Sequence, residues 1–415
     1  MKFLTLSNWA VVLLGLVVNQ GVNALVLIVI ARQVSPVEYG QYLACYGLAS
    51  LMIVLPNAGL DAFLLARGSA DPANMPRWWQ SSVRLRLRLL LLWLGLMILL
   101  SFCLAPDTYP LAVLLPVTVG LACDSLTLLS YSALRGLGRH GPVTAAQVLA
   151  ALLLLGVTLA WPFGSGQIVR FCIFRALLSA IFVAPVGLLV RQFLRQPVGV
   201  TPVRCLFQQA RPFALADVAT AVYMKADLTI VSLFLGSVGA SVYGPALSIV
   251  NMSFLVPNAL YFFMLPFLAR SFAADRRRFA RVGAAQLGIQ ALSGMALAAI
   301  LFWLAPMTIR QVFGSDYASS VLVLKLLSPI LVLKSCSFGL AAILTAADLQ
   351  PWRTAVQVVC ALFNTTANLV VIGTLGILGV AMVYLFSEAL LLAGYVWAAH
   401  RRRVGRGAVL GLAQA

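Results

Sequence analysis

Charged residues are scarce in this sequence, and acidic residues are the rarest of them. Only 10% of the 415 residues are charged, with 11 acidic residues against 29 basic ones. Soluble domains carry about 25% charged residues, so this scarcity excludes an ordinary soluble globular protein. The hydrophobic content of 62% and the mean hydropathy of +0.99 are typical of a polytopic membrane protein.

Motifs for catalysis or metal binding are also few. The seven cysteines form no CxxC pair, and most lie inside apolar runs, which is typical of small core residues. The two histidines, His140 and His400, lie in basic flanks, so we expect neither a zinc site nor a buried histidine relay. The sequence has no P-loop and no stretch long enough for a soluble catalytic module. We therefore expect a protein that is not an enzyme and that acts within the bilayer.

Long apolar runs fill most of the chain. A membrane-spanning helix needs about 20 apolar residues. Twelve runs meet this requirement, at 9–31, 40–66, 81–105, 109–134, 143–163, 168–192, 213–235, 242–268, 280–305, 318–345, 353–373 and 378–399. The first run is too long for a cleavable signal, so it is predicted to be a membrane helix.

The spacing of these runs predicts an all-α polytopic membrane protein with two six-helix lobes. The longest connection, 193–212, carries three prolines and falls between the sixth and seventh runs. We therefore predict an N-terminal lobe over 1–192, a cytoplasmic linker over 193–212 and a C-terminal lobe over 213–400. A basic cytoplasmic tail follows over 401–415.

A short stretch occurs twice and indicates an internal duplication. Pro56-Asn57-Ala58 and Pro257-Asn258-Ala259 lie 201 residues apart, and each follows one apolar run and opens the next. The same offset places residues 35–42 opposite residues 236–243. Coincidence is the alternative in so apolar a sequence, but several features in one register favour a parallel repeat of the two lobes.

Basic residues predict the orientation in the membrane. With the N-terminus inside, 22 of the 29 basic residues fall in cytoplasmic flanks, whereas the loops 105–110, 236–241 and 373–379 contain none. Both termini are therefore predicted to be cytoplasmic. The same pattern accounts for the net charge of +18 without a nucleic-acid partner.

Several charged residues nevertheless fall inside the predicted spans. An unpaired charge at the bilayer centre costs about 3 kcal/mol, so each of these residues needs a partner or a hydrated cavity. The basic ones are Arg175, Lys225, Lys325 and Lys334, and the acidic ones are Asp61, Asp124, Asp227 and Glu388. Two interpretations remain open: the charges pair between helices and fix their packing, or cations line a cavity for an anionic substrate while a carboxylate responds to a coupling ion.

Local spacing refines these candidates. Lys225 and Asp227 are two residues apart, so on a helix they point to roughly opposite sides and do not neutralise each other. Arg32 lies near the outer face, where reaching to the interface is the simplest role. Asn364 and Asn368 in the run 353–373 suit either a cavity wall or hydrogen bonds between helices.

Motifs along most of the chain resemble those of the polysaccharide transporters within the multidrug/oligosaccharidyl-lipid/polysaccharide (MOP) flippase superfamily. Residues 32–40 with Pro56 and 59–61 resemble the opening helices of that family. Further matching motifs are 225–227 with 235–236 and 242–243, 313–318, Asn364, Asn368, Gly376, Gly379 and 387–388. Each motif is loose alone, but their common order and topology make the resemblance specific.

The resemblance implies a fold, a cargo and a pathway. It implies two six-helix bundles in a V shape and movement of a polyprenyl-pyrophosphate-linked saccharide from the cytoplasmic to the periplasmic leaflet of a bacterial inner membrane. Such cargo serves O-antigen, capsule or exopolysaccharide synthesis, with a polysaccharide polymerase and ligase as partners. No cofactor is expected apart from a coupling proton or Na⁺. The first helix contains no acidic residue, so a coupling scheme that needs one there does not carry over.

Site residues follow from the same resemblance. Lys225 matches the basic position before the Asp of the seventh helix and is the first candidate to bind the pyrophosphate, followed by Arg175, Lys334 and Arg32. Asn364 and Asn368 are candidates to contact the sugar. The candidates for ion coupling or charge pairing are Asp61, Asp124, Asp227 and Glu388.

Three other functions are considered. A drug antiporter of the same fold favours acid-lined cavities, whereas cations here are at least as numerous as acids. A membrane-embedded polymerase or ligase typically carries a large periplasmic loop, which this sequence lacks. A non-transporting component of a glycan assembly complex would leave the charges in the spans purely structural.

Overall fold

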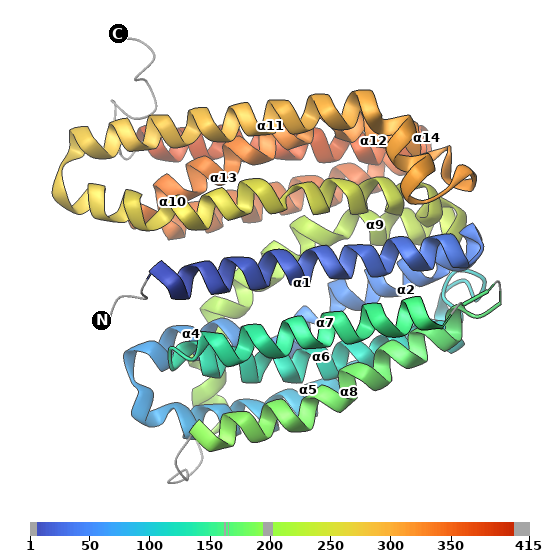
Figure 1. Cartoon of the computed structure of the whole chain (residues 1–415), viewed down its shortest axis with the longest axis horizontal. Helices are drawn as coiled ribbons and strands as arrows, with labels where there is room; N and C mark the ends of the chain where they lie inside the picture. The colour runs from blue at the N-terminus through green and yellow to red at the C-terminus, as the bar shows by residue number, and fades with distance from the viewer. Residues whose placement is uncertain (1–5, 162, 165, 194–201, 402–415) are drawn as a thin grey trace. The chain divides into compact units, whose positions relative to one another are not determined.

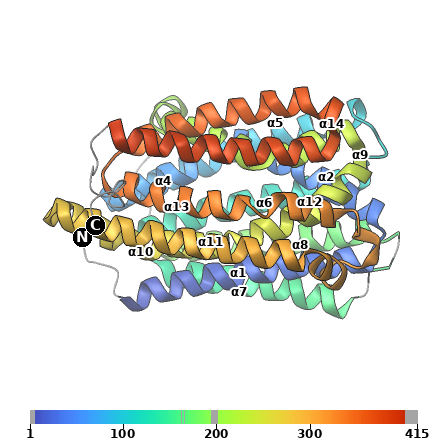
Figure 2. The same ribbon diagram turned by 90° about the horizontal axis from the view of Figure 1, so that it is seen from above.

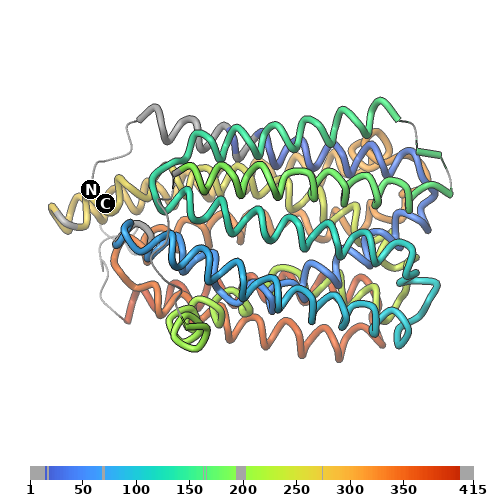
Figure 3. Tube along the Cα trace, turned by 90° about the horizontal axis from the view of Figure 1, so that it is seen from below, coloured from blue at the N-terminus to red at the C-terminus, as the bar shows by residue number. Residues whose placement is uncertain are grey.

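The computed structural model describes residues 6–161, 163–164, 166–193 and 202–401. Within them the regular secondary structure is α-helical, apart from two short 3-10 turns at Pro72–Asn74 and Ser315–Tyr317, and no strand occurs. Most helices run back and forth along one direction within their own half of the chain (Figure 1 and Figure 3). An all-α protein was predicted, and the structure confirms it. Residues 402–415 and residues 194–201 of the predicted linker lie outside the described residues, and residues 203–212 of that linker form the start of a helix.

The chain forms two compact units, and the boundaries between them fall within α9 (Val203–Ser253), which is kinked at Gly236. Unit 1 comprises Met1–Ala221 and Leu235–Ser241, and unit 2 comprises Val222–Phe234 and Val242–Ala415. The helices before the shared helix are α1 (Leu6–Gln33), α2 (Pro36–Met52), α3 (Val54–Asn57), α4 (Leu60–Ala70), α5 (Met75–Cys103), α6 (Leu111–Gly136), α7 (His140–Ala160) and α8 (Ile168–Phe193). The shared helix is α9 (Val203–Ser253), and unit 2 continues with α10 (Leu255–Ala274), α11 (Arg276–Val312), α12 (Ser320–Leu327), α13 (Ile330–Ala346) and α14 (Gln350–Arg401).

Each predicted span coincides with helix in the structure. By length and composition, eight helices of the described residues could cross a membrane, or nine if the bent pair Pro36–Asn57 and Leu60–Arg67 is one span. Two of these segments, Val203–Phe272 and Gln350–Arg401, each hold two predicted spans. In both, the turn expected between the two spans is only a short break in the helix. There Gly236 (φ 67°) and Gly376 (φ 56°) break the helical geometry. The remaining predicted span corresponds to α1.

Irregular backbone recurs at the offset that separates the two Pro-Asn-Ala motifs. This offset places Ser35, the N-cap of α2, opposite Gly236, and it places Ile53 opposite Phe254. Ile53 (φ −65°, ψ −14°) separates α2 from α3, and Phe254 (φ −67°, ψ −9°) separates α9 from α10. Helices therefore start and stop at matching positions, as expected from a duplicated unit.

A second pair of equivalent turns ends α6 and α13. Gly138 (φ 75°) follows α6, and Asp348 (φ 59°) follows α13. The next residue in each case, Arg139 or Leu349, donates its amide to the carbonyl five residues earlier at 2.9 Å, as in a Schellman motif. Glycine adopts a positive φ readily, but an aspartate there is strained. The repeat thus extends over the second half of each unit with a slightly longer offset than that of the Pro-Asn-Ala motifs.

The start of α2 is tied down by one acidic residue. The Ser35 side chain caps the helix, and Glu38 accepts from the Ser35 amide at 3.0 Å, which forms a capping box. The other Glu38 carboxylate oxygen accepts from the Gly166 amide at 2.7 Å. Residues 35–38, part of the motif that resembles the family's opening helices, therefore form a local helix start that also holds the turn before α8.

Close backbone contacts explain two glycines of unit 1. A Cβ on Gly40 would lie 2.0 Å from the Ser237 carbonyl oxygen, and a Cβ on Gly59 would lie 2.2 Å from the Ala214 amide nitrogen. Both contacts join the α2–α4 region to parts of α9 within unit 1. Only glycine, which has no Cβ, lets the two backbones approach so closely.

Each unit has its own apolar core. In unit 1, Phe63, Leu129 and Leu134 pack with Trp79 and Val190. In unit 2, Leu268, Ile343 and Leu344 belong to a similar cluster. Polar and charged side chains are buried next to these cores, and they make up the candidate site.

Candidate functional site

Unit 1 contains a cavity of about 280 Å³ between α1, α6, α7 and α8. Its polar lining is contributed by Asn19, Asn23, Asp124, Thr127, Tyr131, Gln147, Arg175 and Ser179. Amide, hydroxyl and charged groups thus face one space inside a bundle whose outer surface is apolar. Such a space suits a hydrated or hydroxyl-rich ligand group.

Arg175 is held in place from several sides. Its guanidinium donates to the hydroxyl of the fully buried Tyr42 and lies 5.0 Å from the centre of the Tyr46 ring. The Asp124 carboxylate interacts with the Arg175 charge and with the Ser179 side chain. Asp124 is itself exposed towards the cavity. The cavity therefore holds one cation and one anion, and a bound anion would compete with Asp124 for Arg175.

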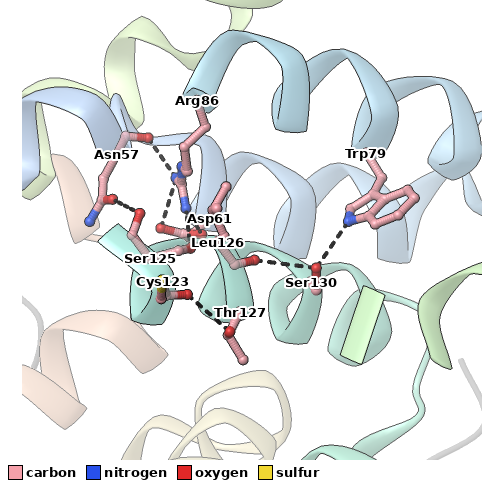
Figure 4. Close-up of polar contacts among 9 residues, drawn as sticks. All are labelled: Asn57, Asp61, Trp79, Arg86, Cys123, Ser125, Leu126, Thr127 and Ser130. Atoms are coloured by element: carbon pink, nitrogen blue, oxygen red, sulfur yellow. Dashed lines mark hydrogen bonds and ion pairs between the residues drawn. The ribbon is translucent and has the colours of Figure 1, made fainter. Parts of the chain in front are cut away.

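A second charged cluster in unit 1 surrounds Arg86 (Figure 4). This arginine is completely buried and pairs with both carboxylate oxygens of Asp61, at 2.8 and 3.0 Å. It also donates to the carbonyl oxygens of Asn57 at 2.8 Å and Ser125 at 2.9 Å. The Asn57 carbonyl is available because Ala58 (φ 48°) and Gly59 (φ 68°) leave the helical conformation and end α3. Arg86 therefore closes the gap left by the helix break.

Unit 2 has a polar network around Asp227, which is only 5% exposed. The Asn368 amide donates to the Asp227 carboxylate at 2.8 Å and to the Asn364 side-chain oxygen at 3.2 Å. Asn364 in turn donates to the Ser387 hydroxyl at 3.2 Å. Asp227, Asn364 and Asn368 thus come together from α9 and α14. This agrees with hydrogen bonding between helices, one of the two roles that the sequence left open for the asparagines.

A buried ion pair lies beside this network. The Lys334 ammonium is 2.9 Å from the carboxylate of Glu388, which has no exposed surface. Tyr223 donates its hydroxyl to the same carboxylate, and the Lys334 ammonium lies 4.6 Å from the centre of the Tyr223 ring. The Lys334 charge is therefore compensated in this structure.

The charged residues on one equivalent pair of helices have opposite signs in the two units. Asp124 on α6 and Lys334 on α13 are separated by the same offset as Gly138 and Asp348, so they occupy equivalent positions of the repeat. Asp124 interacts electrostatically with Arg175 on α8, and Lys334 forms an ion pair with Glu388 in the part of α14 beyond Gly376. The same pair of helices is thus joined by an acid and a base in both units, with the two charges exchanged.

The Asp227 network fits a small cation better than a transition metal. Within the described residues, no group of three or more His, Cys, Asp or Glu side chains could hold a metal ion. Carboxylate, amide and hydroxyl oxygens are the ligands that hard cations prefer. Among those residues, the Asn368 Oδ1 and Glu388 Oε1 atoms are buried without a hydrogen-bond partner. Two acceptors beside Asp227 and Lys334 therefore remain available for a cation or a proton.

The remaining predicted residues lie apart from these clusters. Lys225 is exposed while Asp227 on the same helix is buried, as their spacing predicted. Arg32 is exposed in the last turn of α1. Neither position tests whether these residues bind a substrate.

Sequence reasoning did not predict that Arg86 is buried. Arg86 was one of the 22 basic residues assigned to cytoplasmic flanks. The structure corrects this, since Arg86 lies inside α5 with no exposed surface. A signal was present: Trp79, Ser82, Arg86, Leu90 and Trp93 follow helical spacing, and all five are buried. Arg84 and Arg88 fall off that stripe and are exposed. Tyr42 and Tyr223, which contact the buried charges, carried no such signal.

Comparison with known proteins gives one family and one fold. The family described as "Polysaccharide biosynthesis protein" matches residues 5–272, which is more than half of the chain. No curated protein sequence matches the chain significantly.

Several solved structures have a similar fold. An inward-facing multidrug resistance MATE transporter of the MOP superfamily aligns over 96% of both chains, with a TM-score of 0.73 and 13% identity. The lipid II flippase MurJ in an inward closed conformation aligns over 96% of this chain and 90% of its own, with a TM-score of 0.74 and 12% identity. A MOP superfamily transporter from Pyrococcus furiosus, whose binding pocket is described as having reverse polarity, aligns over 96% of both chains with a TM-score of 0.66 and 14% identity.

These matches agree with the motifs and with the multi-pass helical architecture. The chain belongs to the polysaccharide biosynthesis family, and it has the fold of the MOP-superfamily transporters to which it is similar.

Proposed function

We propose that this protein is a flippase for polyprenyl-pyrophosphate-linked oligosaccharides. It moves its cargo from the cytoplasmic to the periplasmic leaflet of a bacterial inner membrane by alternating access, with both of its own termini in the cytoplasm. The product serves O-antigen, capsule or exopolysaccharide synthesis, alongside a polysaccharide polymerase and ligase. The family supports the lipid-linked cargo.

The observation that carries this proposal is the placement of cations at polar, accessible positions. Arg175 lines a cavity that also holds Asn19, Asn23 and Gln147. Lys225 is exposed in the middle of a predicted span, so its ammonium is accessible to an anion. A pyrophosphate requires such cations, and amides and hydroxyls suit a saccharide. Lys334 and Arg32 rank after Lys225 and Arg175, because one is compensated by Glu388 and the other lies at a helix end.

Asp124 gives this arrangement a means of coupling. While Asp124 is ionised it competes with any anion for Arg175. Protonation of Asp124 removes that competition, so a proton and the pyrophosphate would bind together. In unit 2, Asp227 with Asn364 and Asn368 would hold a proton or Na⁺, and Glu388 would keep Lys334 neutralised. Asp61 takes no part, because Arg86 already occupies both of its oxygens.

The test is transport in liposomes. A fluorescent polyprenyl-pyrophosphoryl oligosaccharide is incorporated, and its appearance in the outer leaflet is followed by an impermeant quencher. We expect wild-type protein and Lys325→Ala to transport, and Lys225→Ala and Arg175→Ala to lose most of the rate. If both variants are folded and transport normally, the proposed anion site is wrong. If the wild type moves none of several lipid-linked saccharides, the flippase function itself is wrong.

The coupling ion is tested in the same liposomes. Imposed pH and Na⁺ gradients are compared for the wild type and Asp227→Asn. We expect one gradient to accelerate transport by the wild type and to have no effect on Asp227→Asn. An unchanged gradient response in the variant would remove Asp227 from coupling.

A cation-coupled drug antiporter is the second candidate, and one observation favours it. Asp124 is an exposed carboxylate in the unit 1 cavity, and a carboxylate of this kind attracts a cationic drug. Export of a cationic dye against its gradient, inhibited by Asp124→Asn, would favour this function over the flippase.

A further inference from the structure

A groove separate from the charged clusters described above opens between α10 and α11. These helices form an antiparallel hairpin (Figure 1 and Figure 2), and Asp275 alone separates them. The groove has a volume of about 590 Å³. Phe263, Met264 and Phe267 line one part of it, and Arg270, Ser271 and Arg278 line the part nearest the turn.

The two parts differ in polarity along the direction of the helix. At about 1.5 Å per residue, positions 263 and 274 of α10 are about 16 Å apart, so the groove passes from an apolar part into a basic one. Phe263 and Phe267 are 51% and 42% exposed, so their rings are accessible to acyl chains. This combination of apolar surface and cationic rim matches a molecule with acyl chains and an anionic head group.

The basic part is strongly charged. Five arginines occur between positions 270 and 281, all of them exposed, and only one acidic residue accompanies them. That residue, Asp275, is engaged as the N-cap of α11, where it accepts from the Arg277 and Arg278 amides at 3.0 and 3.2 Å. The Arg270 guanidinium lies 5.1 Å from the centre of the Phe267 ring, and that of Arg276 lies 4.3 Å from the Phe272 ring. These stacked guanidiniums are held near the groove before any ligand arrives.

We propose that this groove binds an anionic glycerophospholipid, with its phosphate at Arg270 and Arg278 and its acyl chains along Phe263 and Phe267. Paired guanidiniums bind a phosphate at two points, and the Ser271 hydroxyl offers a further donor. Anionic lipids concentrate in the cytoplasmic leaflet, where the predicted topology places this turn. The site is distinct from the transported cargo, and its test does not depend on transport.

The chain offers a matched control for surface charge alone. Arg277 and Arg281 lie at the start of α11 and are also exposed, but they do not line the groove. Arg270→Gln with Arg278→Gln, and Arg277→Gln with Arg281→Gln, therefore remove the same charge from one region. Only the first pair removes the groove's own cations.

The experiment measures lipid bound to purified protein in nanodiscs of phosphatidylcholine with increasing phosphatidylglycerol. Native mass spectrometry counts the retained lipid, and the thermal unfolding midpoint reports its effect. Each basic residue near an anionic surface is worth about 1 kcal/mol, so we expect Arg270→Gln with Arg278→Gln to weaken phosphatidylglycerol binding roughly 30-fold. Arg277→Gln with Arg281→Gln should retain binding within about threefold of wild type.

Three results would overturn the proposal. Equal losses in both double variants would mean general attraction of the turn to an anionic surface. No preference of the wild type for phosphatidylglycerol over phosphatidylcholine would mean no such site. Displacement of phosphatidylglycerol by polyprenyl pyrophosphate at equal concentrations, in the wild type only, would assign the groove to the cargo. A folded Phe263→Ala variant with weaker retention would add support from the apolar part.

Discussion

Replacing Arg86 by alanine should destabilise the protein far more than replacing its neighbours on the same helix. The change leaves the Asp61 side chain, only 17% exposed, without its counter-charge. It also leaves the Asn57 and Ser125 carbonyls without the donor at 2.8 and 2.9 Å. Breaking a buried ion pair from one side costs about 3–5 kcal/mol. We expect Arg86→Ala to lower the free energy of unfolding by this amount.

The assay is unfolding by sodium dodecyl sulfate in detergent micelles, followed by circular dichroism. The exposed Arg88 provides the control, and Arg88→Ala should stay within about 0.5 kcal/mol of wild type. Arg86→Lys keeps the charge but cannot reproduce the paired contact to Asp61, so an intermediate loss is expected.

A double-mutant cycle separates the charge from the packing. Removing both charges with Arg86→Met and Asp61→Asn should cost less than the sum of the single changes, because neither partner is then left as a buried unpaired ion. The reasoning would be refuted if Arg86→Ala were as stable as Arg88→Ala, or if the two single losses simply added.

Three further predictions concern backbone and topology. Gly40→Ala should destabilise unit 1 by about 1–3 kcal/mol through overpacking against α9, whereas Gly95→Ala, with open space around it, should be neutral or stabilising by up to about 1 kcal/mol; equal thermal unfolding midpoints would contradict this. Asp348→Gly should raise the unfolding midpoint, because its φ of 59° favours glycine, and a lowered midpoint would show that the aspartate has a compensating contact. In a background without other cysteines, an impermeant maleimide should label Asp107→Cys from outside intact cells and the native Cys205 only after permeabilisation; the reverse result would invert the predicted topology.

The helical architecture could be read from the sequence because the membrane makes it nearly obligatory. Every backbone amide within a bilayer must be paired locally, so each long apolar run becomes a helix. The repeat was also visible, since helix breaks need particular residues such as glycine or proline. What the sequence did not reveal was how short the breaks at Gly236 and Gly376 are, because a single positive φ changes the direction of the chain without an intervening loop.

The candidate site was only partly predictable. The presence of charges in the spans was plain, but their pairing was not, since partners such as Lys334 and Glu388 lie 54 residues apart in the chain. Arg86 was assigned to a cytoplasmic flank because arginine at a helix end is usually exposed. Its place on a stripe with Trp79 and Leu90 gave the better indication. Roles in binding or coupling remain predictions, because geometry alone does not reveal the cargo.

The two copies of the Pro-Asn-Ala motif have different mechanical consequences. In unit 1 the chain bends by 49° between α2–α3 and α4, and Arg86 clamps the bend with hydrogen bonds to one carboxylate and two carbonyls. In unit 2 helix α10 runs on through the motif, and the neutral Gln290 makes one contact, to the Pro257 carbonyl at 3.0 Å. Pro266, further along α10, has already removed a helical hydrogen bond. During a conformational cycle, flexing should therefore concentrate in α10, while the clamped bend of unit 1 moves as a rigid body.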